Sequence, residues 1–153
     1  MIITAPDNPF VMDLDKYTVF LAGGITNCSN WQAEVAAKLD REDVLIFNPR
    51  RHFYSEGVEE EQIEWEYRYL RQSDIILFYF APETLCPITL YEYGYWVDRR
   101  DSFGCGPKIY VCCHPDYKRI NDVRIQTRLC CPYTEVYTNL EDMTDEISRI
   151  LED

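Results

Sequence analysis

The sequence predicts an α/β protein, a three-layer sandwich in which helices cover both faces of a five-stranded, mostly parallel sheet of the flavodoxin or Rossmann-like type. Short apolar runs alternate with helical patterns along the chain, which is the pattern of repeated βα units. The longest apolar run, residues 75–80, has no polar alternation, so its strand is expected to be buried on both faces, as in a parallel sheet. We therefore expect the strand order 2-1-3-4-5.

Residues 1–16 are expected to form an extended arm packed on the body, and residues 17–153 to form a single domain, in keeping with the length of 153 residues. Two prolines and little periodicity argue against regular structure in the arm. Its apolar side chains favour contact with the domain over a free tail. These side chains are Ile2, Ile3, Phe10 and Val11.

The first predicted strand, residues 17–22, ends in a glycine pair that leads into a predicted helix at about 30–40. Glycines let backbone N–H groups approach a ligand, and a helix N-terminus adds positive potential. Gly23, Gly24 and the following Ile25 are therefore candidate substrate-binding residues. The alternative is a tight turn that needs glycine only for a positive φ, since neither GxGxxG nor a P-loop is present.

The second predicted strand, residues 44–47, ends in the most basic segment of an acidic chain. Asn48 can hydrogen-bond a hydroxyl group or a base edge, and Arg50 or Arg51 can bind an anion through two parallel hydrogen bonds. The alternative is that the arginines form ion pairs with the acidic run at residues 56–61.

Residues 59–72 read as a helix with one apolar stripe. Trp65 and Glu66 lie off that stripe or at its border. A tryptophan in that place either packs on a neighbouring subunit or lines a pocket, so Trp65 is a candidate substrate-binding residue. The predicted stripe consists of Ile63, Tyr67 and Leu70.

The third predicted strand, residues 75–80, leads into a helix over 88–100 that opens beside Pro87. Glu92 falls near the first or second turn, where aromatic neighbours raise the pKa of a carboxyl and the helix N-terminus lowers it. A carboxylate at the carboxyl edge of a sheet is a candidate nucleophile or base; the alternative is a solvent-facing residue that merely favours a helix N-terminus. Asp74 begins the strand at the opposite edge, so we expect it to be structural.

The alternation continues to the end of the chain. A strand is expected at 108–112, followed by a polar loop in which His114 is a candidate for substrate binding. A short helix at 123–129, a strand at 135–137 and a last helix at 140–151 complete the predicted fold.

The net charge of −12 argues against nucleic-acid binding, because so acidic a surface repels phosphate backbones. It does not exclude a small anion held by a local basic pair. No stretch approaches 18 consecutive apolar residues, and the N-terminus lacks the basic start and apolar core of a signal peptide. We expect a cytoplasmic protein without a membrane partner.

Seven cysteines in a chain without a predicted export signal are expected to be reduced thiols. Adjacent residues of a strand point to opposite faces, so neighbouring cysteines do not easily bind one ion. The spacing also matches no usual zinc pattern, and we expect neither a metal nor another cofactor. The residues considered for a zinc site were Cys112, Cys113, His114, Cys130 and Cys131.

An ordered set of motifs resembles the nucleoside 2-deoxyribosyltransferase family, in particular its smaller, divergent branch. The resemblance covers nearly the whole chain. No single motif is highly specific, but the ordered set of motifs is fairly specific. The segments that carry the resemblance are 20–25, 48–51, 62–66, 73–78, 87–94, 113–119 and 121–123.

The resemblance implies a carboxylate that attacks C1′ of a 2′-deoxynucleoside, a deoxyribosyl-enzyme ester, and transfer of the sugar to a second base or to water. The glutamate of the family's Glu-hydrophobic-Gly motif falls on Glu92, which agrees with the choice made from the residues. Related proteins hydrolyse deoxynucleoside monophosphates, for which Arg50 or Arg51 would bind the phosphate. Family members also associate so that neighbouring subunits complete the pocket, which implies a homo-oligomer, a dimer or larger.

Two departures from the family pattern bear on activity. Better-known members carry a tyrosine in the first strand that supports the nucleophile, whereas Phe20 stands here. They also carry an acidic residue before the nucleophile that acts on the base, whereas this segment, 86–89, contains none. Glu66 is the candidate for that role, or the role is unfilled. The alternatives to an enzyme are a nucleotide-binding module without turnover and a protein–protein scaffold that keeps only the fold.

Overall fold

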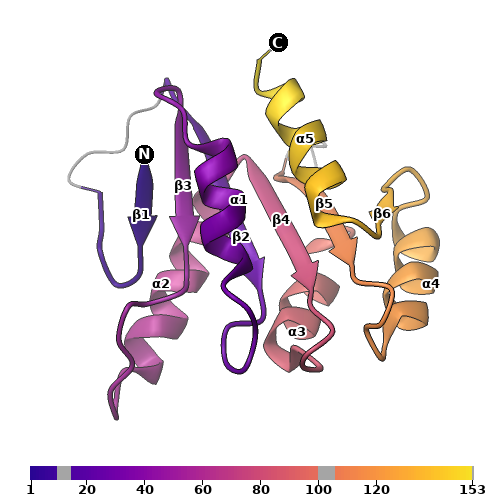
Figure 1. Cartoon of the computed structure of the whole chain (residues 1–153), viewed down its shortest axis with the longest axis horizontal. Helices are drawn as coiled ribbons and strands as arrows, with labels where there is room; N and C mark the ends of the chain where they lie inside the picture. Colours follow the sequence, from indigo (N-terminus) through magenta and orange to yellow (C-terminus); the bar gives the residue numbers. More distant parts are fainter. Residues whose placement is uncertain (10–14, 100–105, 153) are drawn as a thin grey trace.

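The computed structural model describes residues 1–9, 15–99 and 106–152. In these residues six parallel strands form one sheet in the order β1-β3-β2-β4-β5-β6, and all the arrowheads in Figure 1 point toward the same edge. The strands are β1 (Ile2–Thr4), β2 (Tyr17–Gly23), β3 (Val44–Asn48), β4 (Ile75–Phe80), β5 (Lys108–Cys113) and β6 (Val136–Tyr137). The helices are α1 (Trp31–Leu39), α2 (Glu59–Gln72), α3 (Pro87–Trp96), α4 (Ile120–Cys130) and α5 (Leu140–Ile150).

The predicted fold class and strand order are confirmed, with one strand more than expected. The five predicted strands are β2 to β6, and their spatial order is the expected 2-1-3-4-5. The additional strand, β1, pairs in parallel with β3 at the edge of the sheet, with Ile2 opposite Ile46 and Thr4 opposite Asn48. Three residues are too few for a periodicity to be visible in the sequence.

Some details of the prediction differ or fall outside the described residues. The third helix ends at Trp96, earlier than predicted, and the predicted end at residue 100 lies outside the described residues. Phe10 and Val11 of the predicted arm lie outside them too. The fourth helix is longer than predicted at both ends.

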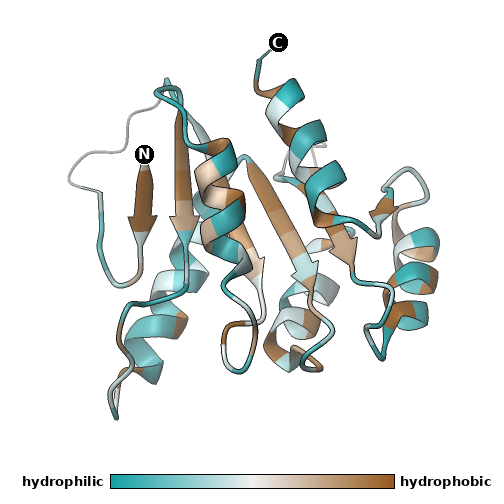
Figure 2. Ribbon diagram, viewed as in Figure 1, coloured by the Kyte–Doolittle hydropathy of each residue, from teal (hydrophilic) through white to brown (hydrophobic). Residues whose placement is uncertain are grey.

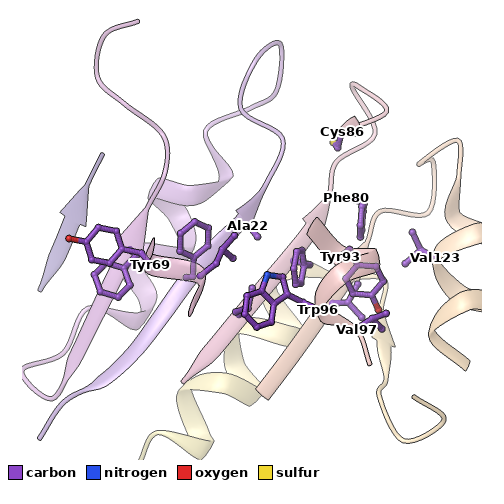
Figure 3. Close-up of a cluster of buried hydrophobic side chains, with 14 of the residues drawn as sticks. Ala22, Tyr69, Phe80, Cys86, Tyr93, Trp96, Val97 and Val123 are labelled. Atoms are coloured by element: carbon purple, nitrogen blue, oxygen red, sulfur yellow. The ribbon is translucent and has the colours of Figure 1, made fainter. Parts of the chain in front are cut away.

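Helices cover both faces of the sheet, so its strands are mostly apolar while the helices carry polar residues on their outer sides (Figure 2). Helices α1 and α5 pack on one face, and α2, α3 and α4 pack on the other. β4 shows the consequence most clearly, since Ile75, Leu77 and Tyr79 contribute to the core under α1 and α5. The intervening Ile76, Phe78 and Phe80 contribute to the other core, part of which appears in Figure 3 with Tyr93 and Trp96 of α3.

The apolar stripe predicted for α2 is confirmed for Leu70, which is buried, and wrong for Ile63 and Tyr67. Ile63 and Tyr67 are 64% and 59% exposed, whereas Trp65 and Tyr69 are each only 3% exposed. Both sets have helical spacing, so periodicity alone does not distinguish them. The aromatic pair has more apolar area to bury, and the Trp65 indole Nε1 donates a hydrogen bond to the Asp7 carbonyl oxygen at 2.7 Å.

At the amino end of the sheet, Asp74 has the structural role expected of it. Its Oδ2 accepts hydrogen bonds from the Thr18 backbone N–H at 2.8 Å and from the Thr18 hydroxyl at 2.7 Å. These bonds tie the beginning of β4 to the beginning of β2. The carboxyl group therefore holds two strands in register.

Candidate active site

A pocket of about 550 Å³ lies at the carboxyl end of the sheet. Its walls come from the connections β2–α1, β3–α2 and β4–α3 and from the helices α2 and α3. The chain proceeds from β2 to β3 on one side and then places β4 on the other side of β2. The pocket therefore occupies the crevice at which open α/β sheets bind ligands.

The position of Glu92 follows from the way α3 begins. Cys86 adopts a left-handed conformation with φ of 46°, and Pro87 follows as the first helical residue, where its fixed φ suits a helix and its missing N–H is not needed. Glu92 lies in the second turn and lines the pocket. The aromatic residues beside it point elsewhere, since Tyr91 is exposed and Tyr93 packs in the core.

Glu92 lies in a poor environment for a negative charge. Burial, and secondly the negative charge of Glu66, raises the pKa of Glu92 to about 8. Within the described residues no hydrogen-bond donor contributes to this pKa, and nothing offsets the effect of burial. The opposing effect of the helix N-terminus, which the sequence led us to weigh, does not prevail. This environment therefore favours the protonated form of Glu92 at neutral pH.

Glu66 is another carboxyl group of the pocket, and its negative charge is better stabilised than that of Glu92. Burial raises its pKa, while a hydrogen bond from Gln62 and the positive charge of Arg51 oppose that rise. The Gln62 amide Nε2 donates to Glu66 Oε1 at 2.7 Å. The negative charge of Glu66 contributes to the raised pKa of Glu92, so the two carboxyl groups interact. Because Gln62 and Arg51 stabilise the charge on Glu66, Glu66 ionises more readily than Glu92.

Gln62 connects Glu66 to a buried arginine. Its Nε2 also donates to the Pro49 carbonyl oxygen at 2.8 Å, and its Oε1 accepts a hydrogen bond from Arg51 Nε at 2.5 Å. Arg51 is 8% exposed and forms an ion pair with Glu61 at 2.7 Å. Arg51 is thus paired with the acidic run, which is one of the two arrangements that the sequence left open. Arg51 does not line the pocket.

Arg50 and Asn48 hold two loops together behind the pocket. Arg50 Nη2 donates to the carbonyl oxygens of Ile25 at 2.5 Å and Cys28 at 2.8 Å. The Asn48 side-chain oxygen accepts a hydrogen bond from the Arg50 backbone N–H at 2.9 Å. Neither residue is among those that line the pocket, and both act on the backbone that forms its wall.

Both glycines of the first βα loop line the pocket, but neither has a positive φ. The explanation by a tight turn is therefore wrong, and lack of space explains both residues. A Cβ on Gly23 would lie 2.4 Å from the Trp31 ring and 2.7 Å from the Tyr79 carbonyl oxygen. The Gly24 carbonyl oxygen accepts hydrogen bonds from Trp31 Nε1 at 3.1 Å and from Gln32 Nε2 at 3.2 Å, which fixes the loop.

The comparison with family models decides the relationship of this chain. The model described as "nucleoside 2-deoxyribosyltransferase like" matches residues 16–117, about two thirds of the chain. The chain belongs to the nucleoside 2-deoxyribosyltransferase-like family. The match includes the glycine pair, Glu66 and Glu92, and the family implies nucleoside binding. A comparison with curated proteins gives no match.

Two residues that were predicted from the sequence to bind substrate lie outside the pocket. Trp65 packs in the core with its ring centroid 6.0 Å from that of Phe20. His114 follows β5, and its Nδ1 accepts a hydrogen bond from the Asp116 backbone N–H at 3.1 Å. Neither lines the pocket.

Sequence reasoning missed several residues that do line the pocket. Gln62 precedes Glu66 by four residues, and Thr89 precedes Glu92 by three, so each shares a helix face with a glutamate. That spacing is a signal from which both could have been found. Other missed polar residues lie in loops, where no periodicity marks them. They are Thr26, Tyr54, Ser55 and Thr84.

The walls of the pocket are mostly apolar, and its charged residues are all acidic. The lining contains three glutamates and no arginine, lysine or histidine. Across the described parts of the chain, no group of three or more histidine, cysteine or acidic side chains is arranged to hold a metal ion. In the same residues, no helix has both the length and the apolar character needed to cross a membrane. The apolar lining residues include Phe20, Ala22, Ile25, Val58, Ile63 and Ile88.

Proposed function

We propose that the protein cleaves the N-glycosidic bond of 2′-deoxynucleosides, with Glu92 as the nucleophile and a deoxyribosyl ester as the intermediate. The observation that carries the proposal is the pair Glu92 and Glu66, which share one largely apolar pocket and interact electrostatically. Membership of the family supports it, because the family match includes both residues. Retaining cleavage of a glycosidic bond needs two such carboxyl groups.

The two glutamates together hold one proton and one negative charge near neutral pH, which is what the reaction requires. The pKa of about 8 keeps the proton on Glu92, and Gln62 and Arg51 stabilise the charge on Glu66. The proton of Glu92 passes to the departing base, relayed by Glu66. The bond between C1′ and the base nitrogen breaks, and the Glu92 oxygen forms a bond to C1′.

The second half of the reaction reverses these steps with a new acceptor. Water or a second base attacks C1′ of the ester, the Glu92 carboxylate leaves, and the pair of glutamates takes up one proton from the acceptor. With water the net reaction is hydrolysis, and with a base it is deoxyribosyl transfer. The apolar walls suit a planar base, which binds by its faces as much as by its edges.

The charge of the pocket favours neutral nucleosides over their 5′-monophosphates. Three glutamates line it, and the two nearby arginines are engaged, Arg50 with backbone carbonyls and Arg51 with Gln62 and Glu61. A phosphate group would meet like charge and no guanidinium among the residues that line the pocket. We therefore place 5′-monophosphates second among the substrate classes.

We also propose that the protein forms a homo-oligomer. Large apolar side chains beside the pocket are exposed on α2 and α3, and a second subunit would cover them. Ile63 and Ile88 belong both to this surface and to the pocket wall, so a neighbour placed there would help to close the pocket. The exposed residues are Ile63, Tyr67, Ile88 and Tyr91.

A nucleotide-binding module without turnover is the second candidate. Two observations favour it: Phe20 supplies no hydroxyl group to Glu92, and the segment 86–89 supplies no acid. Such a module would bind nucleosides equally well with Glu92→Ala. A scaffold that keeps only the fold would bind none.

Product analysis of three proteins tests the proposal. Wild type, Glu92→Ala and Glu92→Gln would each be incubated with 2′-deoxynucleosides or their 5′-monophosphates, with and without an acceptor base, and chromatography would follow free and exchanged base. Ribonucleosides serve as the matched substrate control. Base release or exchange by wild type alone supports the proposal, and dependence on the acceptor separates transfer from hydrolysis. Turnover by none of the proteins supports the binding module, and equal turnover by all three would mean that Glu92 is not the nucleophile.

A further inference from the structure

Two cysteines from different loops meet at the wall of the pocket. Cys28 comes from the β2–α1 loop, and Cys86 from the loop before α3, where it appears above Phe80 in Figure 3. A Cβ placed on Gly24 would lie 2.5 Å from the Cys28 sulfur and 2.8 Å from the Cys86 sulfur. Both sulfur atoms therefore reach the same small space, which is open because residue 24 has no side chain.

Other contacts already hold these two loops in position. The Thr84 hydroxyl lies 3.7 Å from the Cys28 sulfur and 3.3 Å from the Cys86 sulfur. The Glu83 carboxylate accepts a hydrogen bond from the Ser29 backbone N–H at 3.2 Å. The Cys28 thiol also has a side-chain hydrogen bond with Cys86. The two thiols are therefore neighbours in two loops that are fixed relative to each other, and a disulfide requires its two cysteines to be held close together.

The remaining described cysteines lack this arrangement. Cys112 and Cys113 are adjacent in β5, are fully buried, and point to opposite faces of the sheet. Cys130 and Cys131 are also adjacent and partly buried at the end of α4. Among the described cysteines, Cys28 and Cys86 are therefore the pair whose thiols come from two separate loops and lie close together.

We propose that Cys28 and Cys86 form a reversible dithiol–disulfide site at the wall of the pocket, oxidised by low-molecular-weight disulfides such as glutathione disulfide. Cys28 reacts first because it is half-buried whereas Cys86 is 3% exposed. Its thiolate attacks the small disulfide and releases one small thiol, which leaves a mixed disulfide. The Cys86 thiolate then attacks the Cys28 sulfur and releases the second small thiol. Two protein thiols are oxidised, and one small disulfide is reduced to two thiols.

The new bond would change the pocket because one of its partners lines the pocket and the other lies in a loop whose neighbouring residues line it. Cys86 lines the pocket and immediately precedes the helix that carries Glu92. Cys28 shares its loop with Gly24 and Ile25, which also line it. A sulfur–sulfur bond draws the loops together over Gly24, so we expect the oxidised protein to bind nucleosides more weakly and to recover with a thiol reductant. This consequence rests on the proposed function, whereas formation of the bond does not.

Peptide mapping tests the site without any assay of activity. The full chain would be equilibrated at a series of ratios of oxidised to reduced glutathione, quenched by alkylation and digested without reduction. We expect a peptide linked through Cys28 and Cys86, which disappears at an excess of reduced glutathione. Because burial raises the pKa of the Cys28 thiol, its formation should be faster at higher pH.

Three variants make the outcome decisive. Cys86→Ser should convert the linked product into a mixed disulfide with glutathione on Cys28, and Cys130→Ser should leave the link unchanged. Gly24→Ala keeps both thiols but fills the space between them, so it should abolish the link. Linkage through other cysteines, or no link under the most oxidising ratio while the partly buried Cys130 or Cys131 is modified, would overturn the proposal. If the disulfide forms but nucleoside binding does not change, the proposed effect of the disulfide on the pocket is wrong. This conclusion holds whether or not the protein turns nucleosides over.

Discussion

The two ends of β4 carry the same chemical group in opposite circumstances. At the amino end, the Asp74 carboxylate accepts two hydrogen bonds from Thr18, at 2.7 and 2.8 Å, and joins two strands. Beyond the carboxyl end, Glu92 lines a pocket, and burial raises its pKa to about 8. The two carboxyl groups differ in the hydrogen-bond donors around them. The group with donors stabilises the fold, and the group without them stays available for a ligand.

The largest effect should separate these two residues. Glu92→Gln removes the nucleophile but keeps the size of the side chain, so we expect kcat/KM on a 2′-deoxynucleoside to fall by roughly 10⁴-fold or more. Asp74→Asn should leave kcat/KM within about threefold and lower the free energy of unfolding by roughly 1–3 kcal/mol. Steady-state kinetics and urea unfolding of both variants measure the contrast. A large loss of activity in Asp74→Asn, with the fold intact, would break the comparison.

The next effect concerns the partner of Glu92. Glu66→Gln removes the group that relays the proton, which should lower kcat by roughly 10²–10⁴-fold for ordinary bases. A 2-deoxyriboside whose leaving group departs without a proton should lose far less. Comparing the two substrates on wild type and variant isolates the proton transfer. An equal loss on both would assign Glu66 to binding instead.

The pH dependence of activity should show the proton that the glutamates share. Since the reaction needs that proton, kcat/KM should fall above about pH 8, by about tenfold per pH unit. It should also fall at low pH, once the carboxylate of the pair is protonated. A profile of kcat/KM from pH 5 to pH 10 tests this. Activity that still rises above pH 9 would argue that the proton has no role.

The pH dependence of stability should also distinguish the two ends of β4. The folded protein binds the Glu92 proton up to a pKa of about 8, whereas the unfolded chain releases it near the ordinary value, so stability falls as pH rises between these values. Glu92→Gln should therefore stabilise the protein by about 2 kcal/mol above pH 8 and by little below pH 4.5. Urea unfolding at several pH values measures the gain. A gain that does not change with pH would mean that it does not come from the charge.

The smallest effect tests the departure at Phe20. This side chain lines the pocket with Glu92, and a hydroxyl group there would add the donor that the carboxylate lacks. Phe20→Tyr should therefore lower the pKa of Glu92 by about one unit and move the alkaline limit of activity toward neutral pH. The pH profile of the variant measures the shift, with Phe47→Tyr in the same core as a control for the added hydroxyl group.

The fold could be predicted because burial leaves a strong pattern in the sequence. The continuous apolar run of β4 indicates a strand covered on both faces, and the alternation of strands and helices determines the class. The strand β1 was missed because three residues carry no period, and the buried face of α2 because two stripes have the same spacing.

The candidate site could be predicted in part. Glu92, Glu66 and the glycine pair line the pocket as the sequence indicated. Their electrostatics could not be predicted, because the aromatic neighbours of Glu92 in sequence are not its neighbours in space. Arg50 donates to a carbonyl oxygen of the β2–α1 loop, and Arg51 donates to Gln62 in α2. No local pattern in the sequence indicates these contacts.

The central claim is that Glu92 forms a covalent bond to the sugar. The most direct measurement is mass spectrometry of the protein quenched in acid during turnover of a 2′-deoxynucleoside, followed by peptide mapping. We predict a deoxyribosyl adduct on the peptide that contains Glu92, present in wild type, lost on incubation with an acceptor base or water, and absent from Glu92→Gln. Base release by wild type with an adduct on a different residue, or at an undiminished rate in Glu92→Gln, would contradict the account.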